Sequence, residues 1–303
     1  IKVIYTTYES NEEMYDTLKS NQTPPYDIVV PSTYYISKMA REGMLETLDK
    51  EKLSNYYNLD YKLLSQPFDP NNHHSIPYLW GSTGITYNAS LIDEVITSWA
   101  ELWNPRYQNS ELIHDDMREV FGVALKVLGY SANSTDPYEI EAAYHKLQEL
   151  KPNIKLFSSE SQSDLYLKKE VKLGMNFNGE GFLANQESFN LQYVYPKEGA
   201  LVWMDSLVIP KGAKHLDNAH AFIDYLLRPE VAKTISEEIG YATPNAEAIK
   251  LLDEETRDNY IVYPSKRNLK NSEMQVDVGE ALPIYEKYWE ALRREGEEAN
   301  ASL

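Results

Sequence analysis

Short β-rich runs alternate with helical patterns along the first part of the chain. Residues 1–6 (Ile-Lys-Val-Ile-Tyr-Thr) and residues 26–31 are rich in β-branched and aromatic side chains, which predicts two strands. Residues 11–20 lie between them and predict a helix. This order of strand, helix and strand is typical of an α/β protein.

Caps and apolar spacing predict further helices. Ser98 and Glu101 have the spacing of a capping box, in which each side chain satisfies a backbone N–H of the other residue, and Pro105 ends that short helix. Asp136-Pro137 begins a longer helix. Apolar residues at offsets 0, 3, 4 and 7 mark two helices packed on a sheet: Ile140, Ala143, Tyr144 and Leu147, and Ala219, Phe222, Ile223 and Leu226.

Composition and length limit the classes of protein to consider. The 303 residues suit two lobes, and because no flexible linker divides them, we expect strands that cross between the lobes. No run approaches 18 apolar residues, so no membrane span is expected. Lysine plus arginine number 29 against 47 acids, a formal charge of −18, which argues against nucleic acid and favours a cationic ligand. The absence of cysteine excludes disulfides and thiolate metal sites.

Trp203 and Asp205 are the first candidates for binding such a cation. Residues two apart in an extended segment face the same way, so the indole and the carboxylate point together. An aromatic face attracts an organic ammonium, and a carboxylate adds a charge-assisted hydrogen bond. The alternative is structural, with Trp203 in the core and Asp205 as a cap.

Asp116 and Glu119 form a second acidic pair, at the start of a helix that continues through Val120, Phe121 and Leu125. Their spacing of three places both carboxylates on one helical face, and the helix N-terminus favours their ionised forms. Two charged acids on one face suit a bound cation better than proton donation. The alternative is that acids are common in first turns because of the helix dipole alone.

The sequence resembles the spermidine/putrescine-binding family of periplasmic solute-binding proteins, which serve ABC transporters. The resemblance covers nearly the whole chain, and a series of matching runs in order is more specific than any one of them. The runs are residues 28–35 (IVVPSTYY), 67–72 (PFDPNN), 75–81 (SIPYLWG), 115–121 (DDMREVF), 203–207 (WMDSL), 226–232 (LLRPEVA) and 239–245 (IGYATPN).

The resemblance implies a type II periplasmic-binding-protein fold: two α/β lobes joined by crossover strands, with the ligand held in a cleft between them. Lobe one is expected at residues 1–82 and 204–249, and lobe two at residues 83–203 and 250–303. The family has a strand and a helix upstream of the position of Ile1, with a Trp-Thr-x-Tyr-like segment that contributes to the cleft. We expect a product that begins at Ile1 to be unstable and to bind weakly.

The site residues implied by the resemblance fall into three chemical groups. Three carboxylates would receive the ammonium groups, aromatic rings would pack on the methylene stem and on the charges, and two polar side chains would add hydrogen bonds. The carboxylates are Asp116, Glu119 and Asp205; the rings are Tyr34, Phe177, Trp203 and Tyr241; the polar side chains are Ser32 and Gln275. Phe177 stands where related proteins have tryptophan, and its smaller ring is a weaker cation partner.

The resemblance also implies function. The protein would capture spermidine, putrescine or both outside the cytoplasm, in a periplasm or tethered by a lipid, and deliver them to a membrane permease. No catalytic residue, metal or cofactor is expected.

Three other functions remain open from the residues. A ferric-binding protein would use Tyr34 and Tyr35, with His73-His74 further along, although neighbouring tyrosines in a strand point to opposite faces. A carbohydrate-active enzyme would use Asp116 with Glu119, or Asp205 with Glu180, but its carboxyls must flank a scissile bond roughly 5 to 10 Å apart. An interaction protein would bind a basic partner through its acidic surface.

Overall fold

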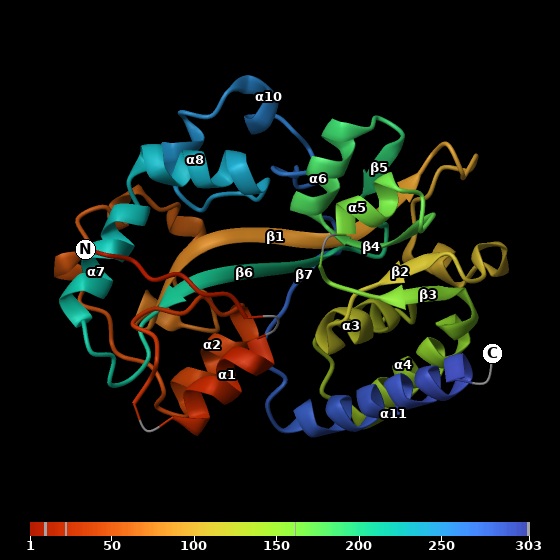
Figure 1. Ribbon diagram of the computed structural model, residues 1–303, viewed down its shortest axis with the longest axis horizontal. Coiled ribbons are helices and arrows are strands. Elements are labelled where there is room, and N and C mark those ends of the chain that lie inside the picture. The colour runs from red at the N-terminus through yellow and green to blue at the C-terminus, as the bar shows by residue number, and fades with distance from the viewer. Residues whose placement is uncertain (9–10, 22, 161, 302–303) are drawn as a thin grey trace. The chain divides into compact units, whose positions relative to one another are not determined.

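The computed structural model describes residues 1–8, 11–21, 23–160 and 162–301, and the chain divides into two compact units. Unit 1 consists of Ile1–Trp80 and Trp203–Asp258, and unit 2 of Gly81–Val202 and Asn259–Leu303. Two strands cross the division: β1 (Ser75–Asn88) passes it after Trp80, and β6 (Leu201–Val208) passes it after Val202 (Figure 1). The expected crossing strands are therefore present.

Strands β1 and β6 belong to a mixed sheet whose other strands lie in unit 2. The order is β3-β2-β4-β1-β6-β7, and β5 pairs with β1. Strand β2 is parallel to β3 and β4, β7 is parallel to β6, and β4 and β5 run antiparallel to β1. The remaining strands are β2 (Glu111–Ile113), β3 (Ile154–Phe157), β4 (Leu173–Phe177), β5 (Leu191–Val194) and β7 (Glu273–Met274).

Helices cover both faces of this sheet in unit 2 (Figure 1). Neighbouring residues of a strand point to opposite faces, and Ile113 accordingly packs with α3, α4 and α11, whereas Leu112 packs with α5 and α6. Both side chains are completely buried. The helices are α3 (Met117–Val127), α4 (Pro137–Leu150), α5 (Gln162–Leu167), α6 (Asn178–Glu187) and α11 (Leu282–Ala301).

Unit 1 has its own core, built around the ends of β1 and β6 that lie in this unit. Ile76 from β1 and Leu207 from β6 are buried with Ile223 and Ala219 of α7. The helices of this unit are α1 (Asn11–Ser20), α2 (Thr33–Arg41), α7 (Leu216–Leu226), α8 (Pro229–Ile239), α9 (Ala246–Ile249) and α10 (Glu254–Arg257).

The two strands predicted near the N-terminus differ from the structure. Val29 forms a bridge to Val208 of β6, with N–H to carbonyl distances of 3.1 and 3.0 Å, but residues 26–31 are otherwise irregular. The predicted strand over residues 1–6 is wrong. Ile1, Ile4 and Tyr5 are 75, 84 and 84% exposed, and no described segment pairs with their backbone. A β-rich pattern produces a strand only where a neighbouring strand can receive its hydrogen bonds.

The helix predictions agree better because caps act locally. Helix α1 has the predicted bounds, and α4 begins at Pro137 after Asp136, whose side chain accepts from the backbone N–H of Tyr138. The segment after Ser98 is a 3-10 helix, Trp99–Trp103. Ser98 is the N-cap, as predicted, and its side chain accepts from the backbone N–H of Ala100. The acidic partner is Glu198 rather than Glu101, because Glu198 accepts from both the Ser98 hydroxyl and the Trp99 backbone N–H.

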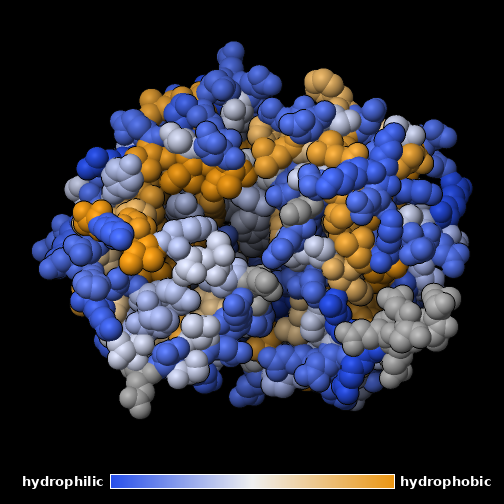
Figure 2. All heavy atoms as spheres, in the orientation of Figure 1, coloured by the Kyte–Doolittle hydropathy of each residue, from blue (hydrophilic) through white to orange (hydrophobic). Residues whose placement is uncertain are grey.

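Hydrophilic side chains predominate on the face of the molecule shown in Figure 2, in keeping with the formal charge of −18. Among the helices that the structure describes, none has both the length and the apolar character to cross a membrane.

Glu111 is an exception to the apolar packing of the sheet. This residue begins β2 and has no exposed surface, its Oε1 is 3.5 Å from Nδ2 of Asn153, and its Oε2 has no hydrogen-bond partner among the described residues. Burial raises the pKa of Glu111 to about 10, so its carboxyl is protonated in the folded protein at neutral pH.

We predict that Glu111→Gln stabilises the protein increasingly as pH rises from 5 to 8. The unfolded carboxyl ionises above about pH 4.5, whereas the folded carboxyl stays protonated, so the wild type loses about 1.4 kcal/mol of stability per pH unit in this range. The amide does not titrate. Urea unfolding at pH 5 and pH 7 measures the difference in free energy of unfolding, and Glu170→Gln, at an exposed position, is the control. A constant difference between variant and wild type would contradict the account.

Candidate functional site

Asp205 is held in unit 1 by a hydrogen bond from Ser32. The Ser32 hydroxyl donates to Oδ1 of Asp205 at 2.7 Å, and the two residues also form an isolated antiparallel bridge. Asn11 fixes Ser32 in turn, because its Oδ1 accepts from the Ser32 backbone N–H at 3.0 Å. The N-cap position of α2 and the strand β6 therefore present one carboxylate with a defined orientation.

The surroundings of Asp205 are aromatic and poor in positive charge. Burial raises the pKa of Asp205 to about 6, and the Ser32 hydrogen bond opposes that rise. The Asp205 charge in turn contributes, after burial, to the raised pKa values of Tyr8 and Tyr78. Tyr8 is fixed by a 2.7 Å hydrogen bond from its hydroxyl to the carbonyl of Val30. At pH 7 Asp205 is thus mostly ionised.

Trp203 lies two residues before Asp205 on β6, as predicted, and is 8% exposed. Its ring meets that of Tyr241 edge to face, with centroids 5.2 Å apart. Tyr241 directly follows Gly240, which ends α8 with φ +72°, a left-handed conformation that glycine adopts readily. A hydrogen bond from Trp80 N to Ala242 O, 3.0 Å long, then anchors the segment to β1.

Tyr34 lies in the first turn of α2, two residues after Ser32. Its ring contacts that of Tyr35, with centroids 5.0 Å apart, and both side chains are buried. Tyr34 therefore stands on a helix, in the turn that follows the N-cap Ser32.

In unit 2, Asp116 and Glu119 begin helix α3. Asp116 is the N-cap, and its Oδ1 accepts from the backbone N–H of Glu119 at 3.0 Å. Glu119 is 3% exposed. Burial raises its pKa, and the negative charge of Asp116 raises it further, whereas Thr83, Arg118 and Gln275 lower it. The expectation that the helix N-terminus keeps Glu119 ionised is therefore opposed by burial.

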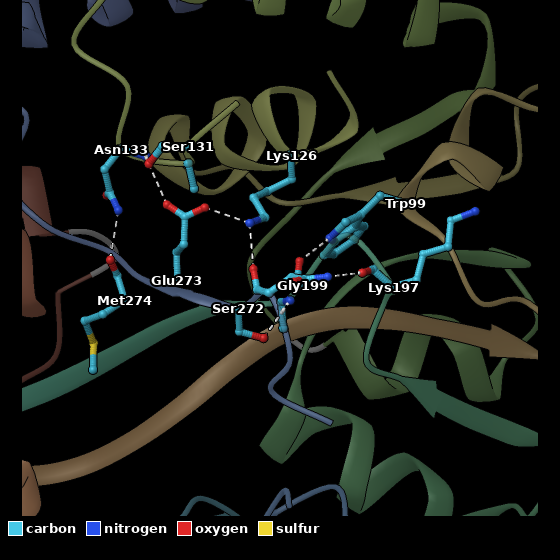
Figure 3. A network of polar contacts seen from close by, with 12 residues as sticks. Trp99, Lys126, Ser131, Asn133, Lys197, Gly199, Ser272, Glu273 and Met274 are labelled. Atoms are coloured by element: carbon cyan, nitrogen blue, oxygen red, sulfur yellow. Dashed lines mark hydrogen bonds and ion pairs between the residues drawn. The ribbon is translucent and has the colours of Figure 1, made fainter. Parts of the chain in front are cut away.

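Gln275 lies beside Glu119 and directly follows β7, which pairs in parallel with β6. A network of polar contacts holds β7 in place (Figure 3). The Gln275 backbone N–H donates to Val202 O at 2.8 Å. The two residues of β7 are held as well: Nζ of Lys126 on α3 donates to Oε1 of Glu273 at 2.7 Å, and Nδ2 of Asn133 donates to the carbonyl of Met274 at 2.9 Å. These contacts fasten β7, which directly precedes Gln275, to the segment formed by α3 and the loop after it.

Phe177 ends β4 and packs against His114, with ring centroids 4.2 Å apart. Its backbone N–H donates to Oε1 of Gln162 at 3.3 Å. His114 has no exposed surface, and its Nδ1 is 4.0 Å from Oε2 of Glu119. Phe177 is thereby joined through one imidazole to the acidic start of α3.

The nine predicted residues thus fall into two sets, one in each unit. Ser32, Tyr34, Trp203, Asp205 and Tyr241 lie in unit 1, and Asp116, Glu119, Phe177 and Gln275 lie in unit 2.

Sequence reasoning missed several neighbours of these residues. Tyr78 lies within a motif that carried the resemblance, and His114 directly precedes the acidic run, so both were within reach. Tyr8 and Gln162 carry no comparable signal, because only the fold brings them to Asp205 and to Phe177.

Two of the other functions can be compared with this geometry. Tyr34 and Tyr35 stand on α2, and among the described residues no group of three or more His, Cys, Asp or Glu side chains is placed to hold a metal ion. The Asp116 carboxylate binds the backbone N–H of Glu119, so both acids approach a ligand from the same end of α3 and do not flank a scissile bond.

Each set offers carboxyl oxygens that lack a resident cation. In the described part of the chain, no Lys or Arg nitrogen lies within ion-pair distance of Asp205 or of Glu119. A buried carboxylate is stabilised by a positive partner with hydrogen-bond donors. The rings nearby can receive the same charge on their faces. The arrangement can therefore bind an organic cation.

Comparison with known proteins agrees with this chemistry. Residues 1–260 match the family described as bacterial extracellular solute-binding protein. The chain is 52% identical over 294 residues to the spermidine/putrescine-binding periplasmic protein of Salmonella typhimurium, covering 97% of this chain and 84% of that protein.

Solved structures give the same result. A putative spermidine/putrescine ABC transporter protein from Listeria monocytogenes has a TM-score of 0.92 and 39% identity, with 97% of this chain and 91% of that chain covered. The spermidine/putrescine substrate-binding protein PotD from Streptococcus pneumoniae has a TM-score of 0.78 and 39% identity, with 95 and 91% covered. These similarities confirm the expected periplasmic-binding-protein fold. The chain therefore belongs to the bacterial extracellular solute-binding proteins, in the group whose members are named spermidine/putrescine-binding periplasmic proteins.

Proposed function

We propose that this protein captures polyamines, spermidine or putrescine or both, outside the cytoplasm and delivers them to the membrane permease of an ABC importer. The relatives named above are periplasmic, which supports the same location for this chain, either free or tethered by a lipid. The protein acts by binding and release and is not an enzyme. The observation that carries the proposal is a pair of carboxyl groups, Glu119 buried and Asp205 partly buried, each without a Lys or Arg partner among the described residues.

In this proposal each set binds one end of the polyamine. Asp205 accepts hydrogen bonds from one ammonium group, while the Ser32 hydroxyl, which donates to Oδ1, keeps the carboxylate in its orientation. Asp116 and Glu119 receive the other ammonium, with Gln275 as an additional polar contact. Trp203 and Tyr241 pack on the methylene chain from unit 1, together with Tyr34, and Phe177 does so from unit 2.

Ligand binding supplies the transport signal. The ligand binds one conformation of the protein more tightly than the others, so binding shifts the population towards that conformation. The permease then recognises the ligand-bound form.

We predict that Asp205→Asn weakens spermidine binding roughly ten- to hundredfold, because a hydrogen bond to a charged group contributes about 1.5–3 kcal/mol. The asparagine carbonyl can still accept from Ser32, so the fold is preserved. Isothermal titration calorimetry with spermidine and putrescine measures the change. Asp217→Asn is the matched control, because Asp217 also lies in unit 1 but has an 87% exposed side chain. Equal dissociation constants for wild type and Asp205→Asn would show that the assigned site is wrong.

We predict a smaller, graded effect at Phe177. Phe177→Trp enlarges the aromatic face and strengthens polyamine binding by a few fold, since a cation over an aromatic ring contributes about 0.5–1 kcal/mol. Phe177→Leu removes the ring and weakens binding by a similar factor. Titration calorimetry measures both, and Phe189→Trp, at an 86% exposed position in unit 2, is the control. If both Phe177 variants bind as the wild type does, the ring makes no contact with the ligand.

A further inference from the structure

His114 is a buried histidine that the proposed site does not use. It follows the last residue of β2 and stands two residues before the N-cap of α3. The side chain has no exposed surface, and its ring lies against Phe177 at a centroid distance of 4.2 Å. Its Nδ1 is 4.0 Å from Oε2 of Glu119, so a titratable base and a titratable acid are neighbours within the protein interior.

The polar atoms of this pair lack ordinary partners. Among the described residues, neither ring nitrogen of His114 nor Oε2 of Glu119 has a hydrogen bond. Gln162 is the polar side chain that opposes the lowered pKa of His114, and its amide is also engaged by the Phe177 backbone N–H and by the Ser158 carbonyl. A buried acceptor left without a donor is costly, so the pair is suited to receive a proton or another cation.

The charged groups around the pair are few. On α3 itself, Asp116 is negative, and the neighbouring Arg118 directs its guanidinium to the carbonyl of Val276 and the side chain of Asn133. The other elements contribute uncharged groups: Thr83 from β1, Gln275 after β7, Gln162 from α5 and Phe177 from β4.

Neutral forms are favoured in such surroundings. Burial raises the pKa of Glu119 and lowers the pKa of His114, so a carboxylic acid beside a neutral imidazole is the stable state without ligand. Because the two groups are close, their titration belongs to the pair.

We propose that His114 is a positioning residue for Glu119: beside the neutral imidazole the Glu119 carboxyl keeps its proton in the free protein, and an ammonium group of the polyamine replaces that proton. The O–H bond of the Glu119 carboxyl breaks, water or buffer takes up the proton, and the resulting carboxylate is the partner of the ammonium. Since His114 stays neutral, it offers no positive charge that competes with the ligand. This inference rests on the proposed function and adds to it that polyamine capture releases a proton.

Titration calorimetry of the full chain with spermidine at pH 7.5 tests the proposal. The binding enthalpy is measured in phosphate and in Tris, which differ in their ionisation enthalpies, and the difference gives the number of protons released. At this pH Asp205, with a pKa of about 6, is already ionised and contributes little. We expect the wild type to release roughly half a proton to one proton per spermidine.

The variants distinguish two roles of His114: keeping the Glu119 carboxyl protonated in the free protein, or only filling space. His114→Asn places an amide donor beside Glu119, which favours the carboxylate already in the free protein, so the released fraction falls to less than half of the wild-type value. His114→Gln is the second variant if the asparagine variant is unstable. Glu119→Gln abolishes the release. His145→Gln, on the exposed face of α4, leaves it unchanged.

Two outcomes would overturn the proposal: equal enthalpies in both buffers for the wild type, or wild-type proton release in the His114 variants that remain folded. Failure of the proposed function is a separate result, namely no heat of binding in any buffer. In that event a measurement on the ligand-free protein still tests the inference. The proton NMR signal of the His114 ring, assigned by its loss in His114→Asn, should shift between pH 6 and 9 in the wild type and lose that shift in Glu119→Gln. A chemical shift that stays constant with pH, or that changes equally in the wild type and in Glu119→Gln, would contradict the titration of Glu119 beside His114.

Discussion

The fold depends at its functional residues on a simple electrostatic constraint: a carboxyl group placed out of water needs either a proton or a positive partner. Glu119 is buried and Asp205 is partly buried, and in the described residues neither has a Lys or Arg within ion-pair distance. The protein stabilises each one only in part, Asp205 by the Ser32 hydroxyl and Glu119 by nearby polar side chains. An organic ammonium can supply the positive partner that each carboxylate lacks, and this interaction contributes to the free energy of binding.

Strand β6 contributes to both sets of residues. Its first part pairs with β7, and the carbonyl of Val202 receives the backbone N–H of Gln275. Three residues later the same strand presents Asp205, which the N-cap residue of α2 orients. The polar network of Lys126, Glu273 and Asn133 holds the segment before Gln275 against α3 (Figure 3). The residues proposed to contact the ligand therefore stand on or beside regular structure, which limits how far their side chains can move.

Much of this could be predicted from the sequence, where the causes are local. The cap at Asp136 and the spacing of Ile140, Ala143, Tyr144 and Leu147 define α4, and the spacing of Asp116 and Glu119 places both acids at the start of α3. Predictions failed where a distant partner decides the outcome. The β-rich residues 1–6 have no described strand beside them, and the acid that accepts from the Ser98 hydroxyl is Glu198, a hundred residues away in sequence. His114 was within reach through its place before the acidic run, but its contact with Phe177 was not, since only the fold brings that ring to it.

The central claim is that the carboxyl groups of Asp205 and Glu119 are the acceptors for the ends of one polyamine. A crystal structure of the protein with spermidine tests it most directly. The account predicts ammonium nitrogens about 2.7–3.0 Å from a carboxyl oxygen of Asp205 and from one of Glu119 or Asp116, with the methylene chain against Trp203. Spermidine bound elsewhere, or bound with water or a lysine in place of an ammonium at Asp205, would contradict it.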